Sequence, residues 1–419
     1  MSAQKIKAIR GMHDITPDKS GHWSRMEATV ARVCAAYAYR EIRMPIVESI
    51  GLFQRSIGDV TDIVEKEMYA FTDRNGEPIA LRPEGTAGCV RACIEHSLLD
   101  TPQKLWYSGP MFRYERPQKG RQRQFHQIGA EAFGFSGVEV EVEQLLLQRK
   151  LWQLFELDGS ISLQLNNIGS SASRAAYRAA LVSYLEQYKT DLDADSQRRL
   201  HSNPMRILDS KDGATQKLLV DAPALADFIG DESSAHFEQL LELLQAAGID
   251  AAINPRLVRG LDYYNDTVYE WVSSDLGAQG TVCGGGRYDS LVEQLGGKPT
   301  PAVGFAMGLE RLYLLLENNS FSCFAADDAP DAYLIVAEPA YQTYAFALAE
   351  RLRSALPGFA IMQQLTAGSV KSQFKKANKS AARFALVVAE QEVASQQVTV
   401  KDLQLGEQLT VELGDGLDA

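Results

Sequence analysis

Cysteine is scarce in this chain. Only five cysteines occur among 419 residues, and no two of them are spaced as a C-x-x-C pair. This usage argues against a disulfide framework and against a zinc site built on thiolates, and it is typical of a reducing compartment. We therefore expect a cytoplasmic protein that holds no metal ion of its own.

Long hydrophobic runs are also missing. No apolar run approaches the roughly 20 residues that a membrane-spanning helix needs. Residues 1–17 (MSAQKIKAIRGMHDITP) contain no apolar segment of the kind found in signal peptides. We expect no membrane association. The composition, 45% hydrophobic and 23% charged, is typical of a globular protein long enough for several domains.

An excess of positive charge is absent, since the formal net charge is −12. This argues against non-specific coating of nucleic acid, but a local basic patch can still bind a polyanion. Residues 351–389 form one such patch, because they contain no acid. Within it Lys371, Lys375, Lys379 and Arg383 recur at every fourth position, which predicts one face of a helix that an anionic partner would stabilise. A solvated helix face explains the pattern equally well.

Residues 103–135 hold the densest chemistry. Two runs with strand character, 105–114 and 125–135, flank a basic loop interrupted by Pro117 and Gly120, which predicts a long hairpin. Because strand side chains alternate between faces, one sheet surface should carry a guanidinium, an aromatic ring, an amide and a carboxylate beside a gap left by glycine. We expect a polyanion there, with a solvated basic hairpin as the alternative. The residues of this surface are Tyr107, Met111, Arg113, Phe125, Gln127, Gly129 and Glu131.

Three further segments carry candidate binding residues. Residues 82–86 (RPEGT) lie between a strand at 78–81 and a helix at 87–99, where Glu84 and Thr86 would suit a cationic amine. Alternatively, Thr86 simply caps the helix. The glycine run at 284–286 would let backbone approach a ligand. Arg311, in the first turn of a helix at 309–317, would add a phosphate donor at a helix N-terminus, or else lie on the surface.

The rest of the chain predicts the domain organisation. Residues 170–250, rich in Ala, Leu and Gln, show helical periodicity and form an insertion between two halves of a β-rich core. After a linker at 318–331, β and α segments alternate, as in a small α/β domain with a mixed sheet. We therefore expect a core of residues 1–169 and 251–325, a helical insertion at 170–250 and a C-terminal α/β domain at 326–419.

Taken together, these segments resemble the histidyl-tRNA synthetases, a family of class II aminoacyl-tRNA synthetases. The strand-like segment 40–48 around Pro45, the stretch from Arg113 to Phe125, and residues 304–311 (GFAMGLER) are similar to the three motifs of the class. Residues 257–271 (LVRGLDYYNDTVYEW) and 284–291 (GGGRYDSL) are similar to the histidine-specific signatures, and RPEGT fits the bacterial form. Ser290 departs from the pattern, because family members commonly have glycine there.

The resemblance implies an α+β catalytic domain on an antiparallel sheet, with a helical insertion and a C-terminal α/β domain that binds the anticodon. The activity would be ATP-dependent ligation of L-histidine to tRNA(His) through histidyl-adenylate, by a homodimer that uses Mg²⁺ with ATP. A non-catalytic paralog, the histidine-sensing regulatory subunit of ATP phosphoribosyltransferase, is the alternative. Such paralogs typically lack the C-terminal domain and lose key arginines, whereas this chain has Arg113, Arg259, Arg311 and residues 331–419.

The resemblance also implies a role for each candidate residue. Arg113 and Arg259 would act on the reacting carboxylate and α-phosphate. ATP would be held by Arg113, Glu115, Arg121, Phe125 and Arg311. Histidine would be held by Glu84, Thr86 and Gln127 at its ammonium group, by Glu131 and Tyr264 at its imidazole, and by Arg259, Tyr263 and Tyr288 around it. The loop residues Arg116, Gln118 and Arg123 would meet the acceptor end of the tRNA, and we infer that Lys371, Lys375 and Lys379 contact its phosphates.

Overall fold

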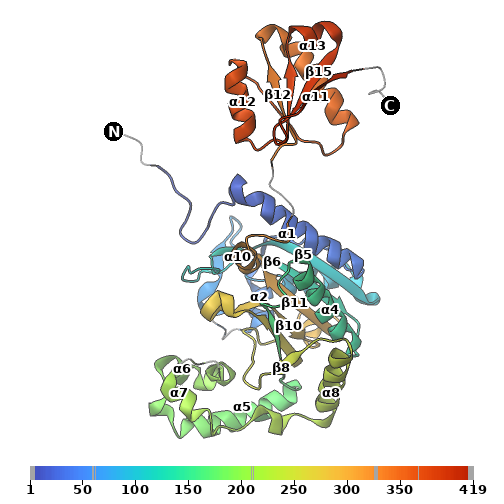
Figure 1. Cartoon of the computed structure of the whole chain (residues 1–419). Helices are drawn as coiled ribbons and strands as arrows, with labels where there is room; N and C mark the ends of the chain where they lie inside the picture. The colour runs from blue at the N-terminus through green and yellow to red at the C-terminus, as the bar shows by residue number, and fades with distance from the viewer. Residues whose placement is uncertain are drawn as a thin grey trace. The chain divides into compact units, whose positions relative to one another are not determined.

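The computed structural model describes residues 5–58, 61, 63–208, 210, 212–324, 329–366 and 368–413. The chain forms two compact units, Met1–Phe324 and Ala325–Ala419. The second unit is the one coloured orange to red in Figure 1. No helix in the described part of the chain is both long enough and apolar enough to cross a membrane.

The first unit is built on an eight-stranded sheet. Its neighbouring strands are antiparallel except at the two edges, where β1 pairs with β5 and β7 with β8 in parallel. The predicted α+β architecture on an antiparallel sheet is therefore confirmed. In spatial order the strands are β1 (Arg40–Glu41), β5 (Gln103–Phe112), β6 (Gln124–Phe133), β11 (Ala302–Gly308), β10 (Thr281–Arg287), β9 (Asn265–Val272), β7 (Ser162–Asn167) and β8 (Ala251–Ile253).

Helices cover one face of this sheet. Helix α1 (Pro17–Ala36) packs against α4 (Glu139–Leu154), and α4 packs against α8 (Asp231–Ala246). Side chains of these helices and of α10 (Leu309–Asn318) share one buried core with alternate residues of the strands, including Ile128 and Tyr269. Because strand residues alternate, Gln127 and Glu270 point to the other face, which the helices leave open for a site.

The hairpin predicted around residues 103–135 is present as β5 and β6. Tyr107 pairs with Gly129 and Met111 with Phe125, so the predicted shared face is confirmed. The first strand ends at Phe112, two residues short of the expected bound, and the second begins at Gln124. Arg113 still donates its backbone N–H to the carbonyl of Arg123 at 2.9 Å, so the chain remains aligned with the hairpin.

A smaller sheet of three strands, in the order β2 (Val47–Ser49), β4 (Pro78–Leu81) and β3 (Tyr69–Thr72), lies beside this unit's helix α2 (Ile50–Ile57). A tight turn joins β3 to β4, in which the Asp73 carboxylate accepts the backbone N–H groups of Asn75 and Glu77 at 2.8 and 2.9 Å. The single strand predicted over residues 40–48 is wrong. It is divided into β1 and β2 around Pro45, which has no N–H for a sheet ladder.

The segment predicted as an insertion, residues 170–250, contains α8, which packs against α4, and the helices α5 (Ser171–Glu186), α6 (Ala194–Ser202) and α7 (Gly213–Leu218). Figure 1 shows these three helices grouped together, apart from α1 and α4. Helix α6 was not predicted, because its sequence has few apolar residues; Asp193 stabilises its start by accepting the N–H groups of Asp195 and Ser196 at 3.0 Å.

The second unit is an α/β domain with a mixed five-stranded sheet, as predicted. Strand β12 is parallel to both of its neighbours, and the later pairs are antiparallel. Strand β16 and helix α13 had no counterpart in the sequence prediction. The elements are β12 (Ala332–Val336), α11 (Gln342–Ala355), β13 (Ile361–Gln363), α12 (Val370–Lys379), β14 (Phe384–Val388), α13 (Glu390–Ser395), β15 (Gln397–Asp402) and β16 (Gln408–Glu412).

The basic helix face of this domain is shorter than predicted. Helix α12 ends at Lys379, and Ala381 has a positive φ of 57°, so Arg383 does not continue the helix. Arg383 instead forms an ion pair with Asp402, at 3.4 Å. The expectation that Arg383 shares the face is wrong, whereas Lys371, Lys375 and Lys379 lie on α12 as predicted.

Candidate active site

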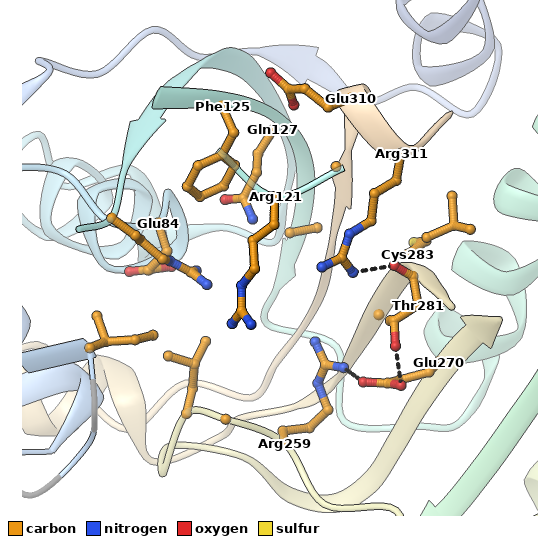
Figure 2. A pocket seen from close by; sticks show the side chains of 18 of the residues that line it. Glu84, Arg121, Phe125, Gln127, Arg259, Glu270, Thr281, Cys283, Glu310 and Arg311 are labelled. Carbon is orange, nitrogen blue, oxygen red and sulfur yellow. Dashed lines mark hydrogen bonds and ion pairs between the residues drawn. The ribbon is translucent and has the colours of Figure 1, made fainter. Parts of the chain in front are cut away.

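A pocket of about 330 Å³ lies on the open face of the large sheet. Its walls come from β6, β9, β10, the first turn of α10, and the loops around residues 84, 113–122 and 259–264. Figure 2 shows these side chains directed toward a common space. Of the residues predicted to bind ATP or histidine, this pocket gathers Glu84, Thr86, Arg113, Glu115, Arg121, Phe125, Gln127, Arg259, Tyr263, Tyr264 and Arg311.

Four arginines meet in the pocket. Figure 2 shows Arg121, Arg259 and Arg311 pointing into the same space, and Arg113 lies with its guanidinium carbon 5.3 Å from the centre of the Phe125 ring. Burial lowers the pKa of Arg311, and the positive charges of Arg121 and Arg113 lower it further. Burial likewise lowers the pKa values of Arg113 and Arg121. An anion would relieve this repulsion, so the pocket suits a multiply charged ligand.

Arg259 is held in place by an acid on strand β9. It forms an ion pair with Glu270, whose other oxygen accepts the Thr281 hydroxyl at 2.7 Å. Burial works against the charge of Arg259, but Glu270 and the neighbouring tyrosines outweigh it, and the pKa of Arg259 is raised. A Cβ atom on Gly284 would lie only 2.5 Å from an Arg259 nitrogen, so the first glycine of the run makes room for the guanidinium.

Glu270 and Thr281 were not predicted as site residues. The signal was an acid inside the apolar strand TVYEWV, directly opposite Gly284 in the antiparallel register. A charged residue on a buried strand needs a partner, but the sequence did not reveal that the partner is Arg259.

The loop between β5 and β6 folds over the pocket. Glu115 is buried and forms an ion pair with Arg121. Arg311 donates to the carbonyls of Thr281 and Gly120, the latter at 3.4 Å, so the loop and helix α10 are joined through a pocket residue. Gly120 has a φ of +73°, a left-handed conformation that favours glycine at this turn.

Hydrogen-bond acceptors gather in the part of the pocket around Glu84 and Gln127. Glu84 accepts the backbone N–H groups of Thr86 and Ala87 at 2.6 and 2.9 Å, at the start of helix α3 (Thr86–Glu95). The alternative that Thr86 caps this helix is therefore wrong; its hydroxyl donates to Glu131 at 2.8 Å. The side-chain oxygen of Gln127 is buried and has no hydrogen-bond partner among the residues that the structure describes. A donor such as an ammonium group would satisfy that oxygen.

Glu131 lies beneath this part of the pocket and is fully buried. It accepts hydrogen bonds from the hydroxyls of Thr86, Tyr107 and Tyr288, at 2.8, 3.0 and 2.5 Å. Burial raises the pKa of Glu131 to about 8 in spite of these three bonds. Neither Glu131 nor Tyr288 is among the residues that line the pocket; Glu131 lies behind the Thr86 hydroxyl, and Tyr288 contacts Glu131.

Aromatic rings form the wall beside Glu131. The rings of Tyr263 and Tyr264 are 4.7 Å apart, and Tyr288 meets Tyr263 edge-on at 5.5 Å. Burial raises the pKa values of all three hydroxyl groups, so they are neutral hydrogen-bonding groups. Gly129 leaves the space that Tyr107 fills, because a Cβ atom there would lie 2.3 Å from the Tyr107 ring.

The residues predicted for the tRNA lie outside this pocket. Arg116 is on the same loop, and the Arg123 guanidinium stacks 3.7 Å from the centre of the Tyr114 ring. Gln118 lines a second cavity of about 440 Å³ on the other side of the loop. Glu310, which was not predicted, lines both cavities and accepts the backbone N–H of His126 at 2.9 Å.

Throughout the described ranges, no three His, Cys, Asp or Glu side chains gather as a metal-binding group. The pocket carboxylates Glu115 and Glu270 are each paired with an arginine. A divalent cation here would therefore take most of its oxygen ligands from a phosphate-bearing ligand and water.

Comparisons with known proteins show what this chain resembles. A family model described as histidyl-tRNA synthetase matches residues 11–312, and one described as an anticodon binding domain matches residues 331–419. The crystal structure of apo histidyl-tRNA synthetase from S. aureus is 36% identical, with a TM-score of 0.82, and the match covers 99% of each chain.

Two more distant structures show likeness of fold alone. Histidyl-tRNA synthetase from a Nostoc species is 20% identical over 99% of this chain and 98% of its own, with a TM-score of 0.71. A Bacillus halodurans protein described as an ATP phosphoribosyltransferase regulatory subunit/histidyl-tRNA synthetase is 21% identical over 90% of this chain and 97% of its own, with a TM-score of 0.63.

Proposed function

We propose, since this chain belongs to the histidyl-tRNA synthetase family, that its arginine-lined pocket is where histidine is activated by ATP. The protein is an aminoacyl-tRNA ligase that joins L-histidine to tRNA. One observation carries the assignment of the pocket: the guanidinium groups of four arginines and the buried acceptors of Glu84 and Gln127 line one space. Arg113 lies where the two sets meet, because its Nε donates to the carbonyl of Pro83, next to Glu84, at 2.9 Å. Such a pocket suits a polyphosphate beside a primary amine.

The guanidinium groups would hold ATP. Arg113 would bind the α-phosphate, and the Phe125 ring beside it would stack on adenine. Arg121 and Arg311 would bind the outer phosphates, while Glu115 orients Arg121 through their ion pair. Mg²⁺ bound to the phosphates would neutralise part of their charge.

The acceptors around Glu84 and Gln127 would hold histidine. Its ammonium group would donate to Glu84, to Thr86 and to the partnerless oxygen of Gln127. Its imidazole would lie against Tyr264, with one ring nitrogen directed toward Glu131, which lies behind the Thr86 hydroxyl. Tyr263 and Tyr288 complete this part of the site. Two polar partners for one imidazole would reject apolar amino acids of similar size, because these two groups of the protein would be left unpaired.

The reaction then needs positioning more than proton transfer. A carboxylate oxygen of histidine attacks the α-phosphorus, a new P–O bond forms, and the bond to the bridging oxygen breaks, so that diphosphate leaves with the electron pair. Arg113 and Arg259 would flank the reacting groups and offset the repulsion between two anions. In the second step a terminal ribose hydroxyl of tRNA attacks the adenylate carbonyl. An ester forms, AMP leaves, and the hydroxyl proton passes to a phosphate oxygen or water.

Further features support the assembly that we propose. The apolar side chains of Ile46, Val47 and Phe71 are 41%, 41% and 47% exposed near the small sheet, a surface that suits a second copy in a homodimer. The lysines of α12 suit tRNA phosphates, and Arg116, Gln118 and Arg123 suit its acceptor end. A cytoplasmic location agrees with buried, reduced thiols at Cys34, Cys89, Cys93 and Cys283.

A histidine-sensing regulator is less well supported. The pocket retains Arg113, Arg259 and Arg311 in contact with one space, whereas a sensor of histidine needs no triphosphate site. Aminoacylation of tRNA(His) by the purified protein tests the assignment. Histidyl-tRNA should form only when ATP and histidine are both present; folded protein that forms none would contradict the assignment.

A further inference from the structure

The loop at residues 257–264 carries three of the proposed site residues, Arg259, Tyr263 and Tyr264. It has no strand or helix of its own, so its backbone depends on other elements for hydrogen bonds. One side of the loop faces the main pocket. The other side faces a separate cavity of about 280 Å³, whose far wall is made by the helical insertion.

Arg174, on helix α5 of the insertion, reaches the end of this loop. Its guanidinium donates to the backbone carbonyl of Tyr264 and, at 3.5 Å, to that of Gly169. Burial lowers the pKa of Arg174, but the carboxylates of Asp266 and Asp262 work in the other direction. A partly buried cation on a backbone carbonyl is a directional contact, so it fixes where that carbonyl lies.

Asp262, in the middle of the loop, is the second point of contact. The Asn203 amide lies 3.3 and 3.5 Å from the two Asp262 oxygens. Burial raises the pKa of Asp262, while Asn203 and the positive charges of Arg206 and Arg174 lower it. The insertion therefore supplies both the hydrogen bond and the counter-charge for this carboxylate.

Apolar packing also joins the loop at residues 257–264 to the helical insertion. Val258, Tyr263 and Tyr264 belong to one buried cluster with Leu200 and Ile207 of the insertion. Arg259 differs, because its ion pair with Glu270 ties it to strand β9 of the sheet. The tyrosines are thus held from two sides, by the insertion and by Tyr288 beside the sheet, whereas the ion pair of Arg259 is with the sheet alone.

We propose that Arg174 and Asn203 of the helical insertion are positioning residues for histidine, which act through the backbone of Tyr264 and the side chain of Asp262. The inference rests on the proposed role of Tyr263 and Tyr264 in the histidine site. It predicts that loosening either contact weakens binding of histidine while ATP binding is kept, since the residues proposed for the outer phosphates lie on the hairpin loop and α10.

The test is ATP–diphosphate exchange by full-length Arg174→Met, Arg174→Lys and Asn203→Ala, with KM measured for each substrate. Arg198→Met is the matched control, because Arg198 lies in the same insertion and forms an ion pair with the exposed Asp195, at 3.0 Å. We expect the KM for histidine to rise about tenfold in Arg174→Met and about threefold in Asn203→Ala, as loss of one hydrogen bond to a charged group allows. Arg174→Lys should recover part of the loss, and Arg198→Met should behave as wild type.

Two results would overturn the inference. One is a lower midpoint of thermal unfolding with an unchanged KM for histidine, which would mean that the contacts are structural only. The other is an equal rise in KM for both substrates. If Arg174→Met does not fold, the KM values and the midpoints of thermal unfolding of Asn203→Ala and Arg174→Lys test the inference instead. A folded wild type without histidine-dependent exchange would instead contradict the proposed function.

Discussion

Arg259 and Glu270 form an ion pair across the floor of the pocket, and Gly284 leaves the space in which the guanidinium lies. The arginine comes from an irregular loop, whereas the acid comes from strand β9. The rigid sheet therefore aims a cation on a loop at the place where two anions are proposed to react.

Replacing Arg259 with alanine should remove a charge that stabilises the transition state. We expect Arg259→Ala to reduce kcat for ATP–diphosphate exchange by about a thousandfold, the scale on which removal of one preorganised donor acts. Its apparent mass in sedimentation should equal that of wild type. Exchange kinetics that match wild type would refute the role of Arg259.

Replacing Glu270 with glutamine should keep the shape of the site but release Arg259 from its counter-charge. We expect Glu270→Gln to reduce kcat about tenfold to a hundredfold, because the guanidinium loses its orientation. Glu95→Gln is a matched control, since Glu95 forms an exposed ion pair with Arg91 at 2.8 Å. Equal activity of the two variants would mean that Glu270 does not position Arg259.

A methyl group at Gly284 should push Arg259 away, because the new Cβ would lie 2.5 Å from its nitrogen. We expect Gly284→Ala to lower kcat at least about tenfold with a modest change in thermal stability. Gly159→Ala is the control, since no atom of the described part of the chain lies within 4 Å of a Cβ there. Unchanged exchange by Gly284→Ala would show that Arg259 does not need its observed position.

The buried Glu131 predicts a dependence of stability on pH. Its pKa rises from 4.5 to about 8 on folding, so the folded protein binds the extra proton between these values and loses stability as pH increases through this window. Each unit of the shift corresponds to about 1.4 kcal/mol, as an order of magnitude. We expect the stability of Glu131→Gln relative to wild type to increase as pH rises from about 4.5 to about 8, and to be constant below about pH 4.5. Thermal unfolding of both proteins across this range measures it, and a constant difference throughout would contradict the assignment of this titration to Glu131.

Charge reversal on α12 should weaken binding of tRNA without affecting activation of histidine. We expect Lys375→Glu/Lys379→Glu to lower tRNA affinity and to reduce the slope of log K against log salt by about 0.7 to 0.9 for each phosphate that is no longer neutralised. Exchange without tRNA should be unchanged. Lys298→Glu, at an exposed position of the first unit, is the control. Equal affinity of the double variant and wild type would mean that α12 is a solvated surface.

The sequence predicts the parts of this molecule that depend on local periodicity. The alternation of Gln127 and Glu131 with buried Ile128 and Ala130 was enough to place one face of the hairpin, and the register confirms it. The sequence shows the glycine run, but it does not show why Gly284 must lack a side chain, because the clash that is avoided involves Arg259 from a distant loop.

Long-range partners explain what the sequence did not reveal. Glu270 was not singled out because its meaning depends on Arg259 and Thr281 across the fold. Glu84 was predicted as a ligand residue, yet it also accepts two N–H groups of helix α3, a geometry that spacing alone does not distinguish from a cap by Thr86. The periodicity of lysines likewise could not reveal that helix α12 stops before Arg383.

The most direct test of the proposed activity is ATP–diphosphate exchange by the purified protein with each of the twenty amino acids in turn. We predict exchange with L-histidine and background rates with the others, because Glu131 and Tyr264 are proposed to bind both imidazole nitrogens. We also predict that Arg259→Ala removes the histidine signal. Folded protein that exchanges with no amino acid, or as well with another as with histidine, would contradict the proposed activity.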